Sequence, residues 1–372
     1  MKKTMAKKGH VQYLDGMRGV AALWVVIYHT WTGGHIVNLA GAPPEAGLTE
    51  VDPALPFWIT SWLFERGWMG VPVFFILSGF VIPLSQANRS DVSFKPLHFM
   101  HRRWRRLSPP YYAALALTIA VGLAEEQIRD VVFEMPSVGT IIAHLLYIQD
   151  LVDAPRIGVF FWTLAIEMQF CLMFALMKWV AGRMSWQYAS DALLGIALVV
   201  SLPWALGWTY AGSDRGVFIA SWFLFLAGQA IFESTRKDYW RWPTFAYVGV
   251  LAVAAFTNSG DERVAAGAVT ALLLLLSVNV DNTPVERALS TRPALFLGRI
   301  SYSLYLIHPS IAGAAFWMVY KVLDPSTATE FIALGLVTAA QIIGAMIWYQ
   351  VFEKPSMQWS RQLRQPAPAH AE

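Results

Sequence analysis

The sequence predicts an all-α integral membrane protein, with about ten transmembrane helices around a polar central cavity and both termini in the cytoplasm. The first observation is composition: 56% of the 372 residues are hydrophobic and only 14% are charged, whereas a soluble protein carries about a quarter charged residues. The second is the recurrence of long apolar segments, and the third is the distribution of Lys and Arg. The 17 Trp, 13 Tyr and 22 Phe residues also suit aromatic belts at two membrane interfaces.

Ten apolar segments approach the ~20 residues that a helix needs to cross hydrocarbon. They lie at 16–32, 68–86, 107–124, 160–180, 190–210, 216–233, 243–258, 264–281, 294–320 and 328–352. An eleventh segment, 138–151, is shorter and carries His144, Gln149 and Asp150 at or near its end. The distribution of charge decides whether this segment is expected to cross.

Cytoplasmic loops of membrane proteins are enriched in Lys and Arg. If 138–151 does not cross and the N-terminus is cytoplasmic, 22 of the 28 Lys and Arg residues lie in the cytoplasm. If the segment does cross, 15 of these residues lie inside and 13 lie outside. The first arrangement is favoured, so 138–151 is expected to be re-entrant or interfacial. Residues 1–356 are expected to form one domain in the cell inner (plasma) membrane, followed by a disordered cytoplasmic tail at 357–372.

Several classes of site are disfavoured. The net charge is only +3, without the clustered basic face that nucleic-acid binding requires. Cys171 is the one cysteine, so neither a disulfide nor a thiolate zinc site can form. The sequence contains no Gly-x-x-x-x-Gly-Lys phosphate loop, no Gly-x-Ser-x-Gly elbow and no His-Glu-x-x-His pair. No metal site is predicted.

Ionisable residues at membrane depth cost about 2.5–3.5 kcal/mol each to insert, so each needs an explanation. Arg18 lies near the cytoplasmic start of the first span. His29 follows eleven residues later, which places it roughly 16 Å deeper and on the same helix face. The two side chains therefore suit one wall of a pocket. An interfacial histidine between Tyr28 and Trp31, with no chemical role, explains the position equally well.

A carboxylate and a basic cluster are further candidates. Glu167 follows Trp162 by five residues, about a turn and a half inside the fourth span. A carboxylate near a histidine can orient the imidazole as a general base and stabilise its charged form, although a structural ion pair is an equal alternative. Arg102, Arg103, Arg105 and Arg106 precede the third span and can clamp phosphates. Ordinary positive-inside topology with anionic lipid explains these arginines as well.

The ninth span repeats the pattern of the first, with Arg299 near the cytoplasmic end and His308 nine residues deeper. Pro309 follows the histidine and predicts a kink that frees a backbone carbonyl for a polar partner. A structural role is favoured for His308. Side chains expected to line the central cavity are Ser78, Trp162, Arg299, Ser301, Tyr302, Tyr305 and His308.

Taken together, these residues resemble the acyltransferase 3 family of membrane O-acyltransferases. Each motif alone is weak, but their ordered set covers nearly the whole chain. The motifs are Tyr13-Leu-Asp-Gly-Met-Arg18-Gly with His29, Phe74-Phe-Ile-Leu-Ser78-Gly79-Phe80, Arg102-Arg-Trp-Arg-Arg-Leu-Ser-Pro109, Trp162-Thr-Leu-Ala-Ile-Glu167-Met-Gln-Phe, Gly298-Arg-Ile-Ser-Tyr-Ser-Leu-Tyr-Leu-Ile-His308 and Phe352-Glu-Lys-Pro355. Two positions depart from the family pattern, Thr163 in place of a serine and Cys171 in place of a tyrosine.

The resemblance implies transfer of an acyl group, commonly acetyl from acetyl-CoA, to a hydroxyl of a sugar, glycan, lipid-linked glycan or small natural product. Acyl-CoA is then a co-substrate, and no permanently bound cofactor is implied. His29 would be the catalytic histidine, oriented by Glu167, and Arg18 with an Arg-x-x-Arg pair would bind the donor. The proline register favours Arg103 and Arg106 for that pair over Arg102 and Arg105.

Two other classes of protein are alternatives to an acyltransferase. A proton-coupled transporter or flippase would also have about ten spans with buried Arg and His, although neither an inverted repeat nor a matching pair of broken spans is visible. A regulatory protein that kept the fold but lost the chemistry is disfavoured, because Arg18, His29 and Glu167 are all present.

Overall fold

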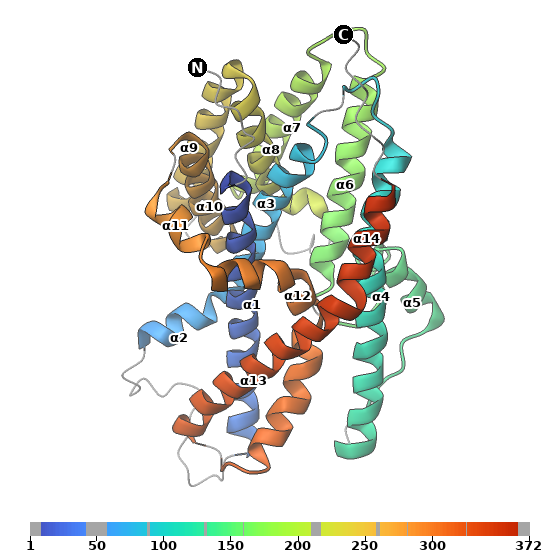
Figure 1. The fold of residues 1–372 in the computed structure, drawn as a ribbon, viewed down its shortest axis with the longest axis vertical. Helices are drawn as coiled ribbons and strands as arrows, with labels where there is room; N and C mark the ends of the chain where they lie inside the picture. The colour runs from blue at the N-terminus through green and yellow to red at the C-terminus, as the bar shows by residue number, and fades with distance from the viewer. Residues whose placement is uncertain are drawn as a thin grey trace. The chain divides into compact units, whose positions relative to one another are not determined.

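The computed structural model describes residues 9–41, 58–87, 90–129, 132–158, 160–209, 217–257, 261–280, 282–324 and 326–363. Within these ranges every regular element is helical (Figure 1). The α-helices are α1 Gly9–Gly41, α2 Trp58–Glu65, α3 Gly70–Leu84, α4 Pro96–Arg129, α5 Val138–Leu145, α6 Trp162–Ala181, α7 Ala189–Ala205, α8 Trp222–Arg236, α9 Arg241–Thr257, α10 Glu262–Asn279, α11 Pro284–Leu289, α12 Arg292–Tyr320, α13 Thr327–Trp348 and α14 Lys354–Gln362. Short 3₁₀ turns occupy η2 Gly67–Met69, η3 Phe218–Ser221 and η4 Asp238–Trp240, and η5 Tyr349–Glu353 is π-helical.

Each of the ten predicted spans overlaps a helix, which confirms the all-α class. Among the described residues, six helical segments are long and apolar enough to cross a membrane, and they indicate a multi-pass membrane protein. They are Gly67–Leu84, Pro96–Ile128, Trp162–Ala181, Phe218–Arg236, Glu262–Asn279 and Ala328–Gln362, with Ala189–Ala205 as a shorter apolar helix. The count of ten and the cytoplasmic placement of the termini stay predictions.

The short segment near residue 140 forms a helix of only eight residues, α5, whose N-terminus is capped by the Ser137 side chain. An eight-residue helix rises about 12 Å, which is well short of the ~30 Å of hydrocarbon in a bilayer. This length agrees with a segment that does not cross. At the other end of the chain, helix α14 continues to Gln362, so the first residues of the tail expected from 357 onwards are helical. Residues beyond 363 lie outside the described ranges.

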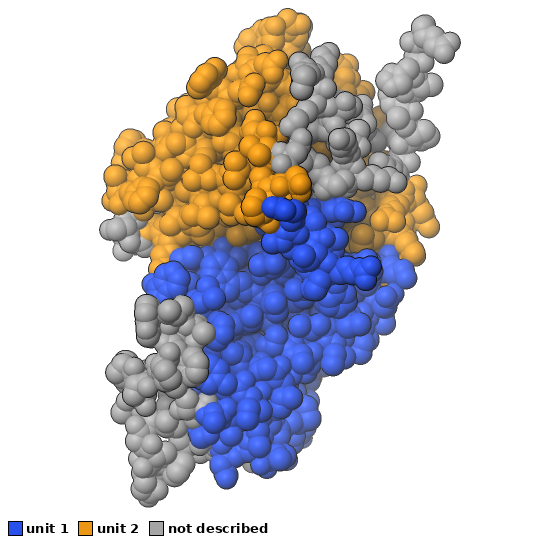
Figure 2. Space-filling model, turned by 60° about the vertical axis from the view of Figure 1, so that its left-hand side comes forward, with its two compact units in different colours: residues 1–71, 113–133, 287–354 blue, residues 72–112, 134–286, 355–372 orange. Residues whose placement is uncertain are grey.

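The chain divides into two compact units, coloured separately in Figure 2. The first comprises residues 1–71, 113–133 and 287–354, and the second comprises 72–112, 134–286 and 355–372. Each unit holds a different subset of the predicted site residues.

In the first unit, α1, α12 and α13 pack against one another, and glycines bring the first two backbones into contact. A Cβ atom at Gly19 would overlap the backbone of Gly298, and a Cβ atom at Gly298 would overlap the backbone of Asp15. Small residues allow this close approach, which is a common way for helices to associate in lipid. The glycines beside both candidate arginines, Arg18 and Arg299, therefore have a packing role.

In the second unit, α3 and α8 approach through a reciprocal pair of glycines. Gly79 of α3 lies against the backbone of Phe225, and Gly228 of α8 lies against the backbone of Ile76. Phe225 also stacks between Phe75 and Phe170, at centroid distances of 4.7 and 4.2 Å. This contact fixes the helix that carries Ser78.

Candidate functional site

Two imidazole rings meet inside the first unit. The Nε2 atom of His308 on α12 lies 3.2 Å from the Nδ1 atom of His29 on α1, and the ring centroids are 5.1 Å apart. His308 is fully buried, whereas His29 is partly buried. The sequence favoured a structural role for His308 and did not predict this contact.

The register of α1 and α12, which run in the same direction, explains the contact. Gly19 and Gly298 touch through their backbones, and the same offset of 279 residues separates His29 from His308. Each histidine lies ten residues, or roughly 15 Å, beyond the glycine contact on its own helix. The two helices therefore keep the same register from the glycines to the histidines. Figure 1 shows α1 in blue and α12 in orange.

Each imidazole also faces a carbonyl of its own helix. The Nδ1 atom of His29 lies 3.0 Å from the Val25 oxygen. The Nδ1 atom of His308 lies 2.9 Å from the Tyr305 oxygen and 3.2 Å from the Leu304 oxygen. Pro309 has no N–H to donate to the Tyr305 carbonyl four residues earlier. The carbonyl that the sequence expected Pro309 to free thus faces the side chain of His308.

A polar bridge from α13 supports the pair. The amide nitrogen of Gln341 donates to the backbone oxygen of His308 at 2.9 Å, and the hydroxyl of Thr30 donates to the Gln341 amide oxygen at 3.0 Å. Gln341 and Thr30 are fully buried. Thr30 directly follows His29, so the bridge links the two histidine positions through a third helix. The sequence offered one signal for it, a lone glutamine inside an apolar span.

The other polar residues predicted on α12 have different surroundings. The Ser301 hydroxyl donates to the Gly298 oxygen of its own helix at 2.9 Å. Tyr305 is buried with its ring 5.9 Å from that of His308, Tyr302 is partly buried and Arg299 is exposed. Arg18, on α1 beside the glycine contact, is partly buried.

The closing Phe-Glu-Lys-Pro motif is explained by a buried carboxylate. Glu353, in the π-helical turn η5, accepts from the Ser303 hydroxyl at 2.6 Å and from the Ser303 backbone N–H at 3.1 Å. Both side chains are buried. Glu353 belongs to a motif of the family resemblance but was not predicted as a site residue, because the sequence does not reveal its partner on another helix.

In the second unit, Glu167 lies on α6 and accepts from the Ser78 hydroxyl of α3 at 3.4 Å. Trp162, in the first turn of α6, packs edge-on against Phe75 at 6.5 Å. The structure therefore brings Ser78 and Glu167 together. His29 belongs to the first unit and Glu167 to the second, so their predicted pairing stays a prediction.

A basic pocket of about 190 Å³ lies between the start of α4 and α14. Three of the predicted donor-binding residues, Arg102, Arg103 and Arg106, line it together with Arg361 of α14. The Ser360 hydroxyl donates to the Arg102 backbone oxygen at 2.9 Å, which holds α14 beside the arginines. Arg361 was missed because it falls in a segment that the sequence placed in a disordered tail.

The two possible Arg-x-x-Arg pairs, Arg102 with Arg105 and Arg103 with Arg106, differ in their relation to this pocket. Arg105 does not line it; its guanidinium lies 4.4 Å from the centroid of the Trp359 ring and its Nε donates to His101 at 3.1 Å. Arg103 and Arg106 both line the pocket. Both members of the second pair therefore line the pocket, whereas only one member of the first pair does.

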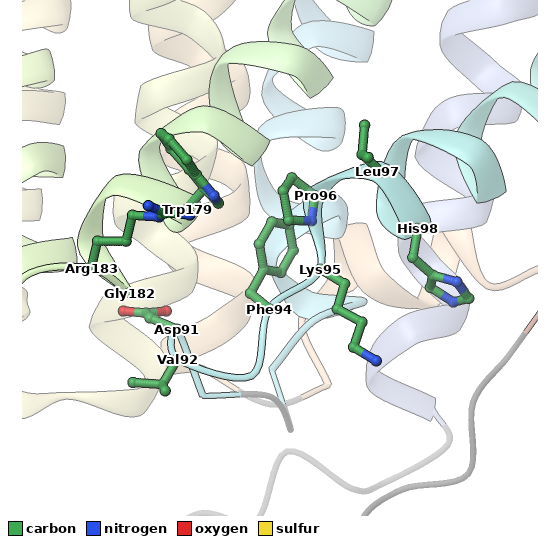
Figure 3. Close-up of a pocket in the computed structure, with 10 residues that line it drawn as sticks. All are labelled: Asp91, Val92, Phe94, Lys95, Pro96, Leu97, His98, Trp179, Gly182 and Arg183. Atoms are coloured by element: carbon green, nitrogen blue, oxygen red, sulfur yellow. The ribbon is translucent and has the colours of Figure 1, made fainter.

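A larger cavity of about 510 Å³ is lined by the first turn of α4 and by the segment that precedes this helix (Figure 3). Trp179, Gly182 and Arg183, from the end of α6, face the segment that contains Lys95 and His98. The Arg183 guanidinium lies 4.2 Å from the Trp179 ring centroid.

Positive charge predominates in this cavity, because a carboxylate that lines it is neutralised by an ion pair. Asp91, which also lines the cavity, is bound by Lys178 at 2.9 Å. The remaining side chains offer positive charge beside an aromatic face, which suits a ligand with phosphate groups and a flat ring. Among the described residues, no group of three or more His, Cys, Asp or Glu side chains is arranged to hold a metal ion.

Comparison with known proteins identifies the family. The sequence profile of the acyltransferase 3 family, described as an acyltransferase domain, matches residues 11–348. The exopolysaccharide production protein ExoZ of Rhizobium meliloti is 26% identical over 329 residues, covering 81% of this chain and 93% of ExoZ. The acyltransferase MdmB of Streptomyces mycarofaciens is 24% identical over 333 residues, covering 78% of this chain and 81% of MdmB.

A further relative, YrhL of Bacillus subtilis, carries a name that provisionally assigns it peptidoglycan O-acetyltransferase activity. It is 25% identical over 345 residues, covering 81% of this chain and 49% of YrhL. No solved structure matches the chain significantly. The family match runs through both compact units and contains nearly all of the residues described above. The chain therefore belongs to the acyltransferase 3 family and is an acyl-transferring enzyme.

Proposed function

We propose that the protein is an O-acyltransferase of the cell inner membrane that moves an acyl group, acetyl in the simplest case, from acyl-CoA to a hydroxyl. The acceptor would be a sugar, a glycan or a small natural product. The name of ExoZ supports a glycan acceptor, because it refers to exopolysaccharide production, and the name of MdmB supports acyl transfer. Residues 1–356 would act as one acyltransferase domain, since the family match runs through both units.

The observation that carries the proposal is the environment of His29. Its Nδ1 atom faces the Val25 oxygen and the His308 ring, so Nε2 is the ring nitrogen available for a substrate proton. In the proposed reaction, Nε2 removes the proton from the acceptor hydroxyl while the oxygen attacks the thioester carbonyl. The C–S bond then breaks, and the imidazolium returns the proton to the departing thiolate. General-base help of this kind is typically worth ~10²–10⁴-fold in rate.

The basic side chains are proposed to bind the donor. Arg103 and Arg106 line the pocket with Arg102 and Arg361, and guanidinium groups bind phosphate through bidentate, charge-assisted hydrogen bonds. The larger cavity, with Trp179 against Arg183, would take the nucleotide end of CoA. Arg18 would contact the donor near the glycine contact of α1. Glu167 would stabilise the positive charge that forms on His29.

Transfer of label from acetyl-CoA tests the proposal. Membranes that contain the overproduced protein are incubated with [14C]acetyl-CoA, and covalently acetylated lipid, glycan and small-molecule fractions are separated. The wild type should label one fraction, and His29→Gln should abolish the label while the protein remains inserted. His144→Gln provides the matched control, because His144 is another fully buried histidine in α5. Label that stays in CoA, or a His29→Gln variant with wild-type transfer, would contradict the proposal.

A further inference from the structure

The two histidines of the first unit have only one arrangement of protons that satisfies the ring contacts described above when both rings are neutral. Carbonyl oxygens accept hydrogen bonds and cannot donate them. The Nδ1 atom of His308 faces the Tyr305 and Leu304 oxygens, so it must carry the proton. The Nδ1 atom of His29 faces the Val25 oxygen, so it must carry a proton as well.

The contact between the rings then has a fixed direction. A neutral imidazole with its proton on Nδ1 has a lone pair on Nε2. The Nε2 atom of His308 therefore accepts from the Nδ1–H of His29 across 3.2 Å. The same proton is shared with the Val25 oxygen at 3.0 Å. The chain of donors runs from His29 through His308 to the carbonyl that Pro309 leaves without a backbone donor.

We infer that His308 is a positioning residue for His29. This inference rests on the proposed function and extends it. By accepting from Nδ1–H, His308 holds the tautomer in which the lone pair of His29 lies on Nε2, the atom that takes the substrate proton. When His29 becomes positively charged, the Nδ1–H bond to His308 strengthens, because a charged donor forms the stronger hydrogen bond.

The surroundings of His308 suit this role. The side chain is fully buried, so water cannot replace the partner that His29 loses if His308 is removed. Gln341 fixes the His308 backbone at 2.9 Å and is itself fixed by Thr30 on α1. The acceptor nitrogen is thereby held in place relative to the helix that carries the base, as preorganised catalytic groups require.

Nitrogen NMR tests the hydrogen bond without reference to activity. Protein labelled with 15N-histidine is reconstituted in lipid vesicles, and the His29 signals are identified by their loss in His29→Gln. We expect His29 and His308 each to show a protonated Nδ1 and an unprotonated Nε2, with a scalar coupling between Nδ1 of His29 and Nε2 of His308. A protonated Nε2 on neutral His29, or the absence of that coupling, would overturn the inference.

Two substitutions of similar size separate positioning from packing. His308→Gln retains a carbonyl oxygen near the place of Nε2, whereas His308→Leu removes the acceptor. His308→Leu should lower kcat by about ten- to a hundredfold, part of the 10²–10⁴-fold that a general base supplies, with the KM for acetyl-CoA within about twofold of wild type. His308→Gln should recover kcat to within about threefold of wild type.

Equal kcat values for the two variants would contradict the positioning role, whether both were high or both low. Thermal unfolding of each purified variant shows whether a low value reflects loss of folded protein. The test of the positioning role and the test of the proposed function can fail independently of each other. If His29→Gln retains acetyl transfer while the NMR coupling is present, the general-base role of His29 fails and the hydrogen bond between the rings stands.

Discussion

The Gly19 backbone of α1 rests directly on the Gly298 backbone of α12, and this contact sets the register in which His29 meets His308. The catalytic proposal therefore depends on two residues that have no reactive groups. Each glycine is next to an arginine, Arg18 or Arg299, so the same contact also places both guanidinium-bearing residues at one level of the helix pair.

Gly19→Ala tests the register directly. An added Cβ would overlap Gly298, so the helices must separate. Overpacking of this kind lowers the free energy of unfolding by about 1–3 kcal/mol, and acetyl transfer should fall with it. Thermal unfolding in detergent, monitored by circular dichroism, measures the change. Gly335→Ala on α13 is the control, because its Cβ would meet open space; a loss of stability there as large as at Gly19 would contradict the explanation.

The basic pocket predicts a difference between neighbouring arginines. Arg106→Gln should raise the KM for acetyl-CoA by roughly ten- to a hundredfold, the value of one or two charge-assisted hydrogen bonds. Arg361→Gln should act in the same direction, because Arg361 lines the same pocket. Steady-state kinetics with varied acetyl-CoA give both constants.

Arg105→Gln serves as the matched control for these variants. Arg105 stacks against Trp359 instead of lining the pocket, so its loss should leave the KM for acetyl-CoA within about twofold of wild type. If Arg105→Gln raised KM as much as Arg106→Gln, a general effect of positive charge would replace the pocket as the explanation.

Glu167→Gln should lower kcat by about 10²-fold and leave the KM for acetyl-CoA nearly unchanged, since a neutral amide cannot stabilise a positive imidazolium. Glu233→Gln is a suitable comparison in the same unit, because Glu233 is a buried carboxylate paired with Lys237 at 3.1 Å. That variant should lose stability and keep its kcat. Wild-type kcat in Glu167→Gln would remove the carboxylate from the mechanism.

Ser303→Ala should destabilise the first unit by about 1–3 kcal/mol, because the buried Glu353 carboxylate loses its hydroxyl donor. Ser301→Ala, two residues earlier, removes a hydroxyl that donates to the Gly298 oxygen of its own helix and should change stability by less than about 0.5 kcal/mol. Chemical unfolding of the two variants in detergent compares them. Similar losses of stability in the two variants would show that the hydrogen bond from Ser303 to Glu353 adds no net stability.

Much of the fold could be predicted from the sequence, because each helix that crosses a membrane needs a long apolar segment and these segments recur along the chain. The positions of the ten apolar segments and the failure of 138–151 to form a long helix follow from hydropathy and charge alone. Single residues could also be selected as candidates where their cost in lipid is high. Arg18, His29 and Glu167 stood out for this reason, whereas the arginines near residue 103 stood out as a basic cluster before the third span.

Partnership between helices was harder to predict. Nothing in the spacing of α1 and α12 reveals a common offset of 279 residues, because that offset depends on which glycines touch. His308 therefore looked like a packing residue, although its acceptor nitrogen lies 3.2 Å from the candidate base. Gln341 and Glu353 escaped selection for the same reason, since each acts on a residue of a different helix. Arg361 was not selected because it lies in the tail that was expected to be disordered.

The long separation between His29 and His308 also affects how the enzyme is made. Helix α1 leaves the ribosome and enters lipid some 279 residues before its partner on α12 is synthesised. During that interval the glycine surface and the imidazole of α1 have no α12 to contact. Catalytic competence is thus a late event in biogenesis, and a nascent chain arrested ahead of α12 would be embedded in the bilayer but inert.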